Sequence, residues 1–222
     1  MSQYLNNKFS VVIPTIWKSD CINELLESYY SCDNIFEVIL IDNDWKNKPE
    51  FPMHKKLMYV QPNENIYVNP AWNLGVKISK CDKVIISNDD VMYNVKLFTD
   101  ATLKLSTSFD KGNFGFLGMD VQNYSLEEDK KELMLKKHQN GMAWACILAL
   151  HKYSWYNIPE QLKIYYGDDF IRRKNSANLF ELHGLKVKSK ISTSADTSVD
   201  WVKSITDNDK MEWDRLLQNG LI

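Results

Sequence analysis

Short apolar runs that end abruptly in polar residues recur along the first part of the chain. Runs rich in Val and Ile and bounded by polar residues predict buried strands. Segments with a helical spacing of apolar positions lie between them, at about 20–31 and 69–80. The expected strands cover residues 9–14, 36–41, 56–60 and 83–87. This alternation predicts an α/β fold with a parallel sheet and right-handed crossovers.

Individual residues mark the expected boundaries of these elements. Pro14 has no N–H donor and is expected to end the ladder of the first strand. Ser19 or Asp20 is expected to cap the first helix. Asn69 is the expected N-cap of the next helix, with Pro70 in its first position.

Beyond residue 90 the alternation of elements loosens. Expected helices cover 95–106 and 207–218, and expected strands cover 113–118, 143–150 and 185–191. A charged stretch at 125–132 is expected to be exposed. Because no Pro-, Gly- or Ser-rich linker divides the sequence and no repeat is found, we predict one domain over residues 1–222.

Acidic residues follow two of the predicted strands directly. Asp42 ends the run 36–41, and Asp89 and Asp90 come just after the run 83–87. In an open α/β sheet the carboxyl ends of the strands form the edge where ligands bind. Two adjacent carboxylates repel each other, and a divalent cation would relieve that repulsion while binding phosphate oxygens. The alternative is a strand that runs into an ordinary polar turn, in which Asn and Asp are common.

Composition narrows the class of protein. The formal net charge is −2, yet residues 130–190 hold twelve Lys or Arg against five Asp or Glu. The excess of basic residues in that segment suits an anionic acceptor such as a lipid phosphate or a nucleic acid. Lysines that are simply solvated explain the excess equally well.

The cysteines and the apolar runs indicate the compartment. The four cysteines form no CxxC pair, residues 1–8 lack the apolar region of a signal peptide, and no apolar run approaches the ~20 residues of a membrane span. We therefore expect a cytoplasmic protein with reduced thiols and no transmembrane segment.

Four blocks of the sequence together resemble the nucleotide-sugar glycosyltransferases of the GT-A fold, most closely family 2. The blocks are 10–15, 37–43, 65–75 and 85–91, in the family's order and spacing. The resemblance implies a mainly parallel central sheet flanked by helices, with a smaller mixed C-terminal part. It also implies a nucleotide-sugar-binding half at 1–94 and an acceptor-binding half at 95–222.

The resemblance assigns roles to residues of the first half. Thr15, Asp42 and Asn43 fall where the family holds the base and ribose of the nucleotide. In the segment 88–90, which matches the DxD-like motif, Asn88 replaces the first Asp. Asp90 is implied to bind a Mn²⁺ or Mg²⁺ that bridges the diphosphate.

Two further residues belong to the implied donor pocket. Asp89 is expected to contact the ribose or the sugar. Asn73 lies on the helix that lines the pocket, although an amide on a helix surface is an equal alternative.

In the second half the segment 167–169 resembles the family's Glu-Asp motif. Asp169 is then the implied general base of an inverting transfer, and Asp168 an orienting or acceptor-binding group. Stabilisation of a helix N-terminus is the structural alternative for this pair. Many relatives carry a His in the segment that corresponds to 191–196, which has none here, and Asp196 or Asp200 is a weak substitute. His183 is expected to be a loop or packing residue.

The activity implied is transfer of a hexosyl or pentosyl group from a UDP- or dTDP-type sugar donor. The expected acceptor is a glycan or lipid-linked glycan, with a modified DNA base as a minority hypothesis. A sugar nucleotidyltransferase is an alternative, but the loop 14–18 lacks the glycines typical of that class. A non-catalytic nucleotide-binding module is a second alternative, disfavoured because the acidic residues are retained. The oligomeric state is not predicted.

Overall fold

The computed structural model describes residues 5, 7–108, 115–137, 147–175, 179–189 and 200–222. Its α-helices are α2 (Ile22–Ser31), α3 (Val68–Ile78), α4 (Val95–Ser108), α5 (Gly167–Lys174) and α6 (Asp200–Gln218). Its strands are β1 (Phe9–Thr15), β2 (Ile35–Asp42), β3 (Leu57–Val60), β4 (Lys83–Ser87), β5 (Val91–Tyr93), β6 (Phe116–Met119), β7 (Met134–Lys137), β8 (Ile147–His151), β9 (Leu179–His183) and β10 (Val187–Ser189). Short 3-10 helices cover Trp45–Asn47 (η1), Val121–Ser125 (η2) and Lys152–Ser154 (η3).

One mostly parallel sheet runs through both halves of the sequence. In the described part of the chain its strand order is β3-β2-β1-β4-β8-β6-β9-β7. Strands β1 to β4 pair in parallel, β8 is antiparallel to both β4 and β6, and β6 pairs in parallel with β9. The strands β1, β2, β4, β6 and β9 therefore all end at the same edge of the sheet. A second, two-stranded sheet pairs β5 with β10, just after the Asp89–Asp90 segment.

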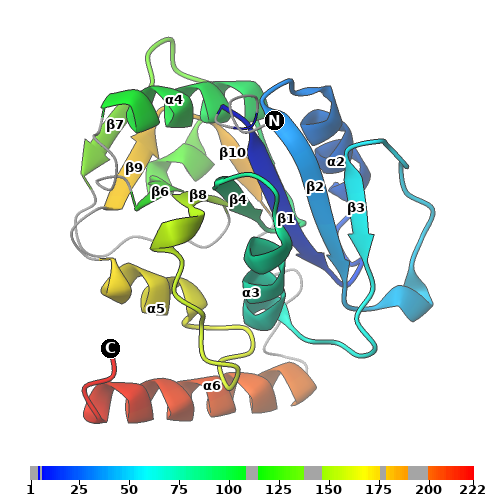
Figure 1. The fold of residues 1–222 in the computed structure, drawn as a ribbon, viewed down its shortest axis with the longest axis vertical. Helices are drawn as coiled ribbons and strands as arrows, with labels where there is room; N and C mark the ends of the chain where they lie inside the picture. The colour runs from blue at the N-terminus through cyan, green and yellow to red at the C-terminus, as the bar shows by residue number, and fades with distance from the viewer. Residues whose placement is uncertain (1–4, 6, 109–114, 138–146, 176–178, 190–199) are drawn as a thin grey trace.

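Helices cover both faces of this sheet (Figure 1). On β1, Val11 and Ile13 join a core cluster with α2 and α4, whereas Val12 between them joins a cluster with α3, α5 and α6. Successive side chains of a strand point to opposite faces, so burial on both sides produces a continuous apolar run. The prediction of an α/β fold with a mainly parallel sheet is confirmed.

The packing of α3 on β1 requires a residue without a side chain. A Cβ atom at Gly75 would lie 2.2 Å from Cγ1 of Val12. Val12 is fully buried, so its side chain has no space into which to retreat. The close approach of α3 to the sheet thus depends on Gly75.

Several boundaries differ from the expected ones. Pro14 does not end the ladder, because β1 continues to Thr15, which pairs with Asp42. Helix α2 has Cys21 rather than Ser19 or Asp20 at its N-cap. Helix α3 starts at Val68, after Tyr67, so Asn69 is not its N-cap; the Asn69 amide instead donates to the carbonyls of Leu162 and Tyr165.

The second half differs more from the expectation. Helix α6 starts at Asp200, seven residues before the predicted start at Asp207. Strands β7 and β9 were not predicted, while β6, β8 and β10 lie within or beside predicted strands. The expected strand residues 113–114, 143–146 and 190–191 lie outside the described residues.

Candidate functional site

The carboxyl ends of β1, β2 and β4 bring three predicted site residues together. Thr15 ends β1 and is the register partner of Asp42 at the end of β2. On the other side of β1, where β4 lies, the Thr15 hydroxyl donates a hydrogen bond of 2.6 Å to Oδ2 of Asp89. All three residues are buried, so this edge is a fixed polar arrangement. We call these residues, together with Asn43 and Asp90, the donor edge.

Asp42 accepts hydrogen bonds on both carboxylate oxygens. Oδ1 accepts from the Trp17 indole N–H at 2.8 Å and from the backbone N–H of Asp44 at 2.9 Å. The Tyr59 hydroxyl donates to Oδ2. Burial, together with the neighbouring Asp42 carboxylate, raises the pKa of Tyr59 well above its usual value. Phe51 packs between the Trp17 and Tyr59 rings, with centroid distances of 5.0 and 5.6 Å, so Asp42 lies beside an aromatic cluster.

Asn43 connects the donor edge to the start of α3. Its backbone N–H donates to the Thr15 carbonyl at 2.9 Å, and its side-chain Nδ2 donates to the Tyr67 carbonyl at 3.3 Å. Its Oδ1 accepts from the backbone N–H of Ile66 at 3.2 Å. Asn43 therefore holds the loop that precedes α3 against the end of the sheet.

Asp89 and Asp90 are 5% and 8% exposed at the end of β4. Burial raises the pKa of Asp89 to about 6; the Thr15 hydrogen bond opposes this rise, and the charge of Asp90 adds to it. Among the described residues, these two carboxylates gather no third His, Cys or acidic side chain at metal-ligand spacing. A Mn²⁺ or Mg²⁺ fits such a pair, because hard cations take oxygen ligands and complete their shell with water or phosphate.

Asn73 serves a contact between α3 and the loop after η3. Its Nδ2 donates to the Ile158 carbonyl at 2.8 Å, and its Oδ1 accepts from Trp155 Nε1 at 3.1 Å and from the Ile158 backbone N–H at 3.0 Å. Both the nitrogen and the oxygen of the Asn73 amide are thus hydrogen-bonded within the protein. This arrangement favours the structural alternative over a contact with the donor.

The second acidic pair lies at the start of α5. Burial, with the charge of Asp169, raises the pKa of Asp168 to about 6. The Asp169 side chain is 38% exposed, and its Oδ1 accepts a hydrogen bond of 2.7 Å from Arg172 Nη2. The Asp169 carboxylate is therefore accessible, and the Arg172 guanidinium one turn further along the helix holds it.

The start of α5 is attached to α3 through a buried amide. A Cβ atom at Gly167 would lie 2.1 Å from Oδ1 of Asn69, so only glycine fits there. Asn69 is fully buried, and its Nδ2 donates to the carbonyls of Leu162 and Tyr165 at 3.3 and 3.0 Å. The acidic pair is thereby held relative to the helix that begins beside Asn43.

A carboxylate of α6 supports the same segment. Asp209 is fully buried and accepts three backbone N–H bonds, from Lys163 at 2.7 Å and from Ile164 and Tyr165 at 2.8 Å each. Trp213, one turn further along α6, stacks on Tyr166 with ring centroids 5.2 Å apart. Neither contact was predicted, because both join residues more than forty positions apart.

Within the described ranges, three non-glycine residues adopt a positive φ, and all three flank these segments. They are Trp17 at 61°, Tyr67 at 65° and Tyr166 at 61°, located after β1, before α3 and before α5. Such a backbone conformation costs of order 1–3 kcal/mol and persists where surrounding contacts impose it. The strained positions thus coincide with the connections that place the acidic residues.

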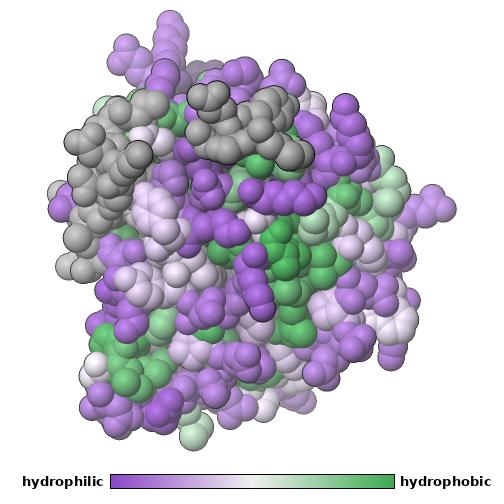
Figure 2. Space-filling model, in the orientation of Figure 1, coloured by the Kyte–Doolittle hydropathy of each residue, from purple (hydrophilic) through white to green (hydrophobic). Residues whose placement is uncertain are grey.

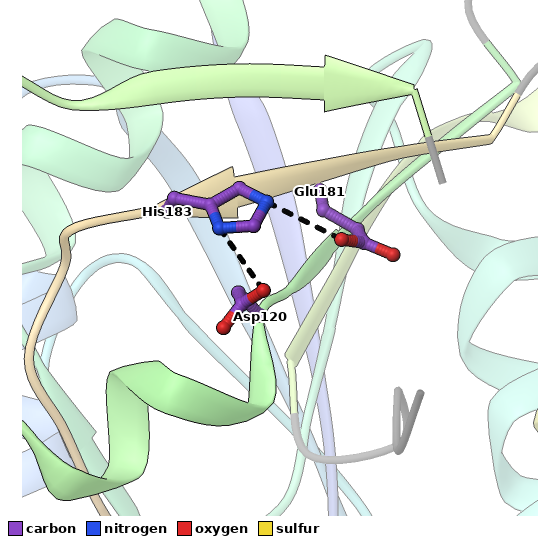
Figure 3. Close-up of side chains that lie close together, drawn as sticks. All are labelled: Asp120, Glu181 and His183. Carbon is purple, nitrogen blue, oxygen red and sulfur yellow. Dashed lines mark ion pairs between the residues drawn. The ribbon is translucent and has the colours of Figure 1, made fainter. Parts of the chain in front are cut away.

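A third group of ionisable residues was missed by the sequence analysis (Figure 3). His183 was expected to be a loop or packing residue, but it ends β9 between Asp120 and Glu181. Its Nδ1 lies 3.0 Å from Asp120 Oδ2, and its Nε2 lies 3.3 Å from Glu181 Oε2. The spacing of Glu181 and His183, two apart on a strand, was the available signal, since it places both on one face. The segment 191–196, where relatives carry a His, lies outside the described residues.

No family model matches the chain, and no curated protein matches it. Among solved structures it is similar to S. aureus TarS 1–349, with a TM-score of 0.58 and 16% identity over 85% of this chain. It is also similar to GalNAc-T7 with UDP, GalNAc and Mn²⁺, with a TM-score of 0.57 and 13% identity over 83% of this chain. The chain spans 62% of TarS 1–349, 37% of a longer TarS structure and 44% of the GalNAc-T7 chain.

The described helices include none that combines the length and apolar character needed to cross a bilayer. Both solved structures are GT-A-type glycosyltransferases, and the chain shares with them a mixed α/β architecture around a mostly parallel sheet. This likeness confirms the fold expected from the four sequence blocks. The chain has the GT-A fold of nucleotide-sugar glycosyltransferases.

Proposed function

We propose that this protein is an inverting glycosyltransferase that uses a nucleoside-diphosphate sugar. The observation that carries the proposal is the buried Asp89–Asp90 pair at the carboxyl edge of a GT-A sheet, held there by Thr15. The similarity to TarS with UDP supports a nucleotide-sugar donor of the UDP or dTDP type.

In this proposal the donor edge binds the nucleotide. Thr15, Asp42 and Asn43 face its base and ribose, and Asp89 faces the ribose or the sugar. Oδ1 of Asp42 already accepts from the Trp17 indole N–H and the Asp44 backbone N–H, so a base that bonds to this oxygen has to displace one of them or share the oxygen with both. Binding of the donor should therefore change the surroundings of Trp17.

Asp90 is the residue that would hold a divalent cation, with Asp89 beside it. A Mn²⁺ or Mg²⁺ bound there would offset the negative charge that develops on the departing diphosphate. Burial, with a smaller contribution from the charge of Asp90, raises the pKa of Asp89, so a negative charge is unfavourable at this position and a cation would offset that cost.

Asp169 is the proposed general base. It accepts the proton of an acceptor hydroxyl while that oxygen forms a bond to the anomeric carbon from the side opposite the diphosphate. The bond between the anomeric carbon and the diphosphate oxygen breaks, and its electron pair leaves with the nucleotide. Arg172 orients the Asp169 carboxylate, and Asp168 bonds to the acceptor or orients its neighbour.

The acceptor is proposed to be a glycan or lipid-linked glycan hydroxyl, and the group transferred a hexose or pentose. Helix α5 exposes Arg173 and Lys174 in its last turn, after the acidic pair. These cations suit an acceptor that carries negative charge. A nucleic-acid acceptor would show binding to DNA that weakens steeply with salt.

Calorimetric titration with UDP, dTDP and GDP, each with Mn²⁺ and with EDTA, tests the donor site. We expect one nucleotide to bind in a metal-dependent manner, and Asp90→Asn to weaken this binding about 10–100-fold. Asp82→Asn, the same change at the exposed amino end of β4, is the matched control and should bind normally. Failure of all three nucleotides to bind would contradict the proposal.

The activity itself is tested by incubating the protein with glycan acceptors and with sugar donors that carry the nucleotide found to bind. Release of the nucleoside diphosphate, with inversion at the anomeric carbon of the product, is expected. A sugar nucleotidyltransferase would instead release pyrophosphate when it is incubated with a nucleoside triphosphate and a sugar 1-phosphate. Tight nucleotide binding without either product would indicate a binding module.

A further inference from the structure

The group formed by Asp120, Glu181 and His183 lies outside the residues of the proposed transfer reaction. Asp120 directly follows β6, and Glu181 and His183 belong to β9, its parallel neighbour. Gly118 pairs with Glu181 and Met119 with Leu182, so the next residues on each strand meet at the carboxyl edge. The sheet itself therefore brings these three side chains together.

The three side chains are largely buried. The exposed fractions of their side chains are 15% for His183, 7% for Asp120 and 7% for Glu181. One ligand atom from each lies within 4.8 Å of the others. Carboxylate oxygens and imidazole nitrogens are metal-ligating atoms, so the three side chains place a mixed oxygen and nitrogen donor set within reach of one ion.

The two ring nitrogens of His183 differ in their surroundings. Nδ1 lies at hydrogen-bond distance, 3.0 Å, from Asp120. Nε2 is buried and has no hydrogen-bond partner in the described part of the chain, although Glu181 Oε2 lies 3.3 Å away. Two ligands about 2.0–2.1 Å from a tetrahedral ion are roughly 3.3–3.4 Å apart. Nε2 and the Glu181 carboxylate thus have the separation of two metal ligands.

Backbone contacts hold the group in this arrangement. Asn123 donates to the Leu182 carbonyl at 2.7 Å and accepts from the Gly184 backbone N–H at 2.9 Å, so it grips the chain on both sides of His183. Asp120 Oδ1 accepts from the Gln122 backbone N–H at 2.6 Å. An imidazole oriented by a carboxylate on one nitrogen is the usual arrangement of a metal-binding histidine.

We propose that this group binds a divalent cation of the zinc class, at a site separate from Asp90. His183 Nε2 and the Glu181 carboxylate are the protein ligands, Asp120 accepts the Nδ1 proton and fixes the tautomer, and water completes the coordination. A mixed nitrogen and oxygen donor set selects Zn²⁺ or Co²⁺ over Mg²⁺, whereas an all-oxygen site selects Mg²⁺ or Mn²⁺. The site does not depend on the proposed transfer activity.

The test is a titration of the metal-stripped full chain with Zn²⁺ by calorimetry, and with Co²⁺ by visible absorption, without nucleotide. One Zn²⁺ per chain is expected to bind, with no competition from millimolar Mg²⁺. His183→Gln and Glu181→Gln should each weaken Zn²⁺ binding at least about 10–100-fold, and Asp120→Asn about tenfold. Asp90→Asn and His151→Gln, the latter at the opposite edge of the sheet, should leave it unchanged.

Two results would overturn the proposal. One is the absence of stoichiometric Zn²⁺ and Co²⁺ binding by the wild-type chain, which would leave His183 as a purely structural partner of the two carboxylates. The other is Zn²⁺ binding that survives His183→Gln and Glu181→Gln. Thermal unfolding in EDTA establishes that each variant is folded. If His183→Gln does not fold, the proposal is tested by the Zn²⁺ affinity of Glu181→Gln and by the presence of a nitrogen ligand in the Co²⁺ spectrum of the wild-type chain.

Discussion

The two acidic pairs of this protein are built in opposite ways. Asp89 and Asp90 are almost fully buried at the end of a central strand, where a hydroxyl of the neighbouring strand holds Asp89. Asp168 and Asp169 start a short helix, and Asp169 is 38% exposed beside Arg172. A buried pair is suited to a ligand that stays fixed during a reaction. An accessible carboxylate is suited to a group that must meet an incoming hydroxyl.

The supports of the two pairs differ as well. The first pair is held by strand pairing, which is repeated along β1, β2 and β4. The second is held by a few buried polar groups, chiefly Asn69 and Asp209, that lie outside α5. Loss of one such group should therefore affect the second pair far more than the first.

The largest effect that separates the two pairs is expected from Asp169→Asn. Without a proton acceptor the transfer rate should fall by about 10²–10⁴-fold. The dissociation constant of the nucleotide should stay within a factor of two, because the donor edge is intact. Steady-state kinetics and calorimetry measure the two quantities.

Arg172→Gln is the matched control for this change, since it breaks the ion pair but keeps the Asp169 carboxylate. It should lower the rate much less. Equal losses in the two variants would assign the role of Asp169 to the ion pair rather than to proton transfer.

A smaller effect is expected from Asp209→Ala, which leaves three buried backbone N–H groups without their acceptor. The free energy of unfolding should fall by about 3 kcal/mol, since bonds to a charged group are each worth ~1.5–3 kcal/mol and water replaces part of the loss. Denaturant unfolding measures this change.

At temperatures where the Asp209→Ala variant is folded, transfer should be slowed while nucleotide affinity is retained. Asp207→Ala, two residues earlier and exposed on the same helix, is the control and should alter neither quantity. A parallel loss of nucleotide affinity would show that the two pairs are not supported independently.

The smallest effect concerns the charge of the first pair. Burial raises the pKa of Asp89 to about 6 from its ordinary value of 3.8, so its ionisation destabilises the folded chain as pH rises between about 4 and 6. Asp89→Asn removes this charge and keeps an oxygen that can accept from Thr15. In EDTA at pH 8 we expect the variant to be more stable than wild type by about 1–3 kcal/mol.

The gain in stability of Asp89→Asn should become small near pH 4, where wild-type Asp89 is protonated in the folded state and only about half ionised in the unfolded state. Unfolding curves at pH 4 and pH 8 measure the difference. A gain that is the same at both pH values would mean that packing, rather than ionisation, is responsible.

The local pattern of the chain was sufficient for the sheet of the first half. Each apolar run forms a strand close to its predicted bounds, and Asp42, Asp89 and Asp90 lie at strand ends as expected. Burial on both faces of a parallel strand requires a continuous apolar run, so the signal is contained in adjacent residues. The roles assigned to these residues at the site remain predictions.

Strands β7 and β9 show where the local pattern failed. The side chains of Met134–Lys137 are mostly exposed, and Leu179–His183 mixes apolar and charged residues. These segments are strands because each pairs with a neighbour far away in sequence, β9 with both β6 and β7. The site of Asp120, Glu181 and His183 depends on those pairings and was missed for that reason.

The sequence by itself therefore determined the fold class and the position of acidic residues at the ends of strands. The tertiary structure alone decided that Asn73 and Asn69 support helix contacts, that Asp209 holds the segment before α5, and that His183 lies between two carboxylates. The physical reason is the range of the interactions. Apolar periodicity is a property of neighbouring residues, whereas a buried polar group finds its partner only after distant segments have packed together.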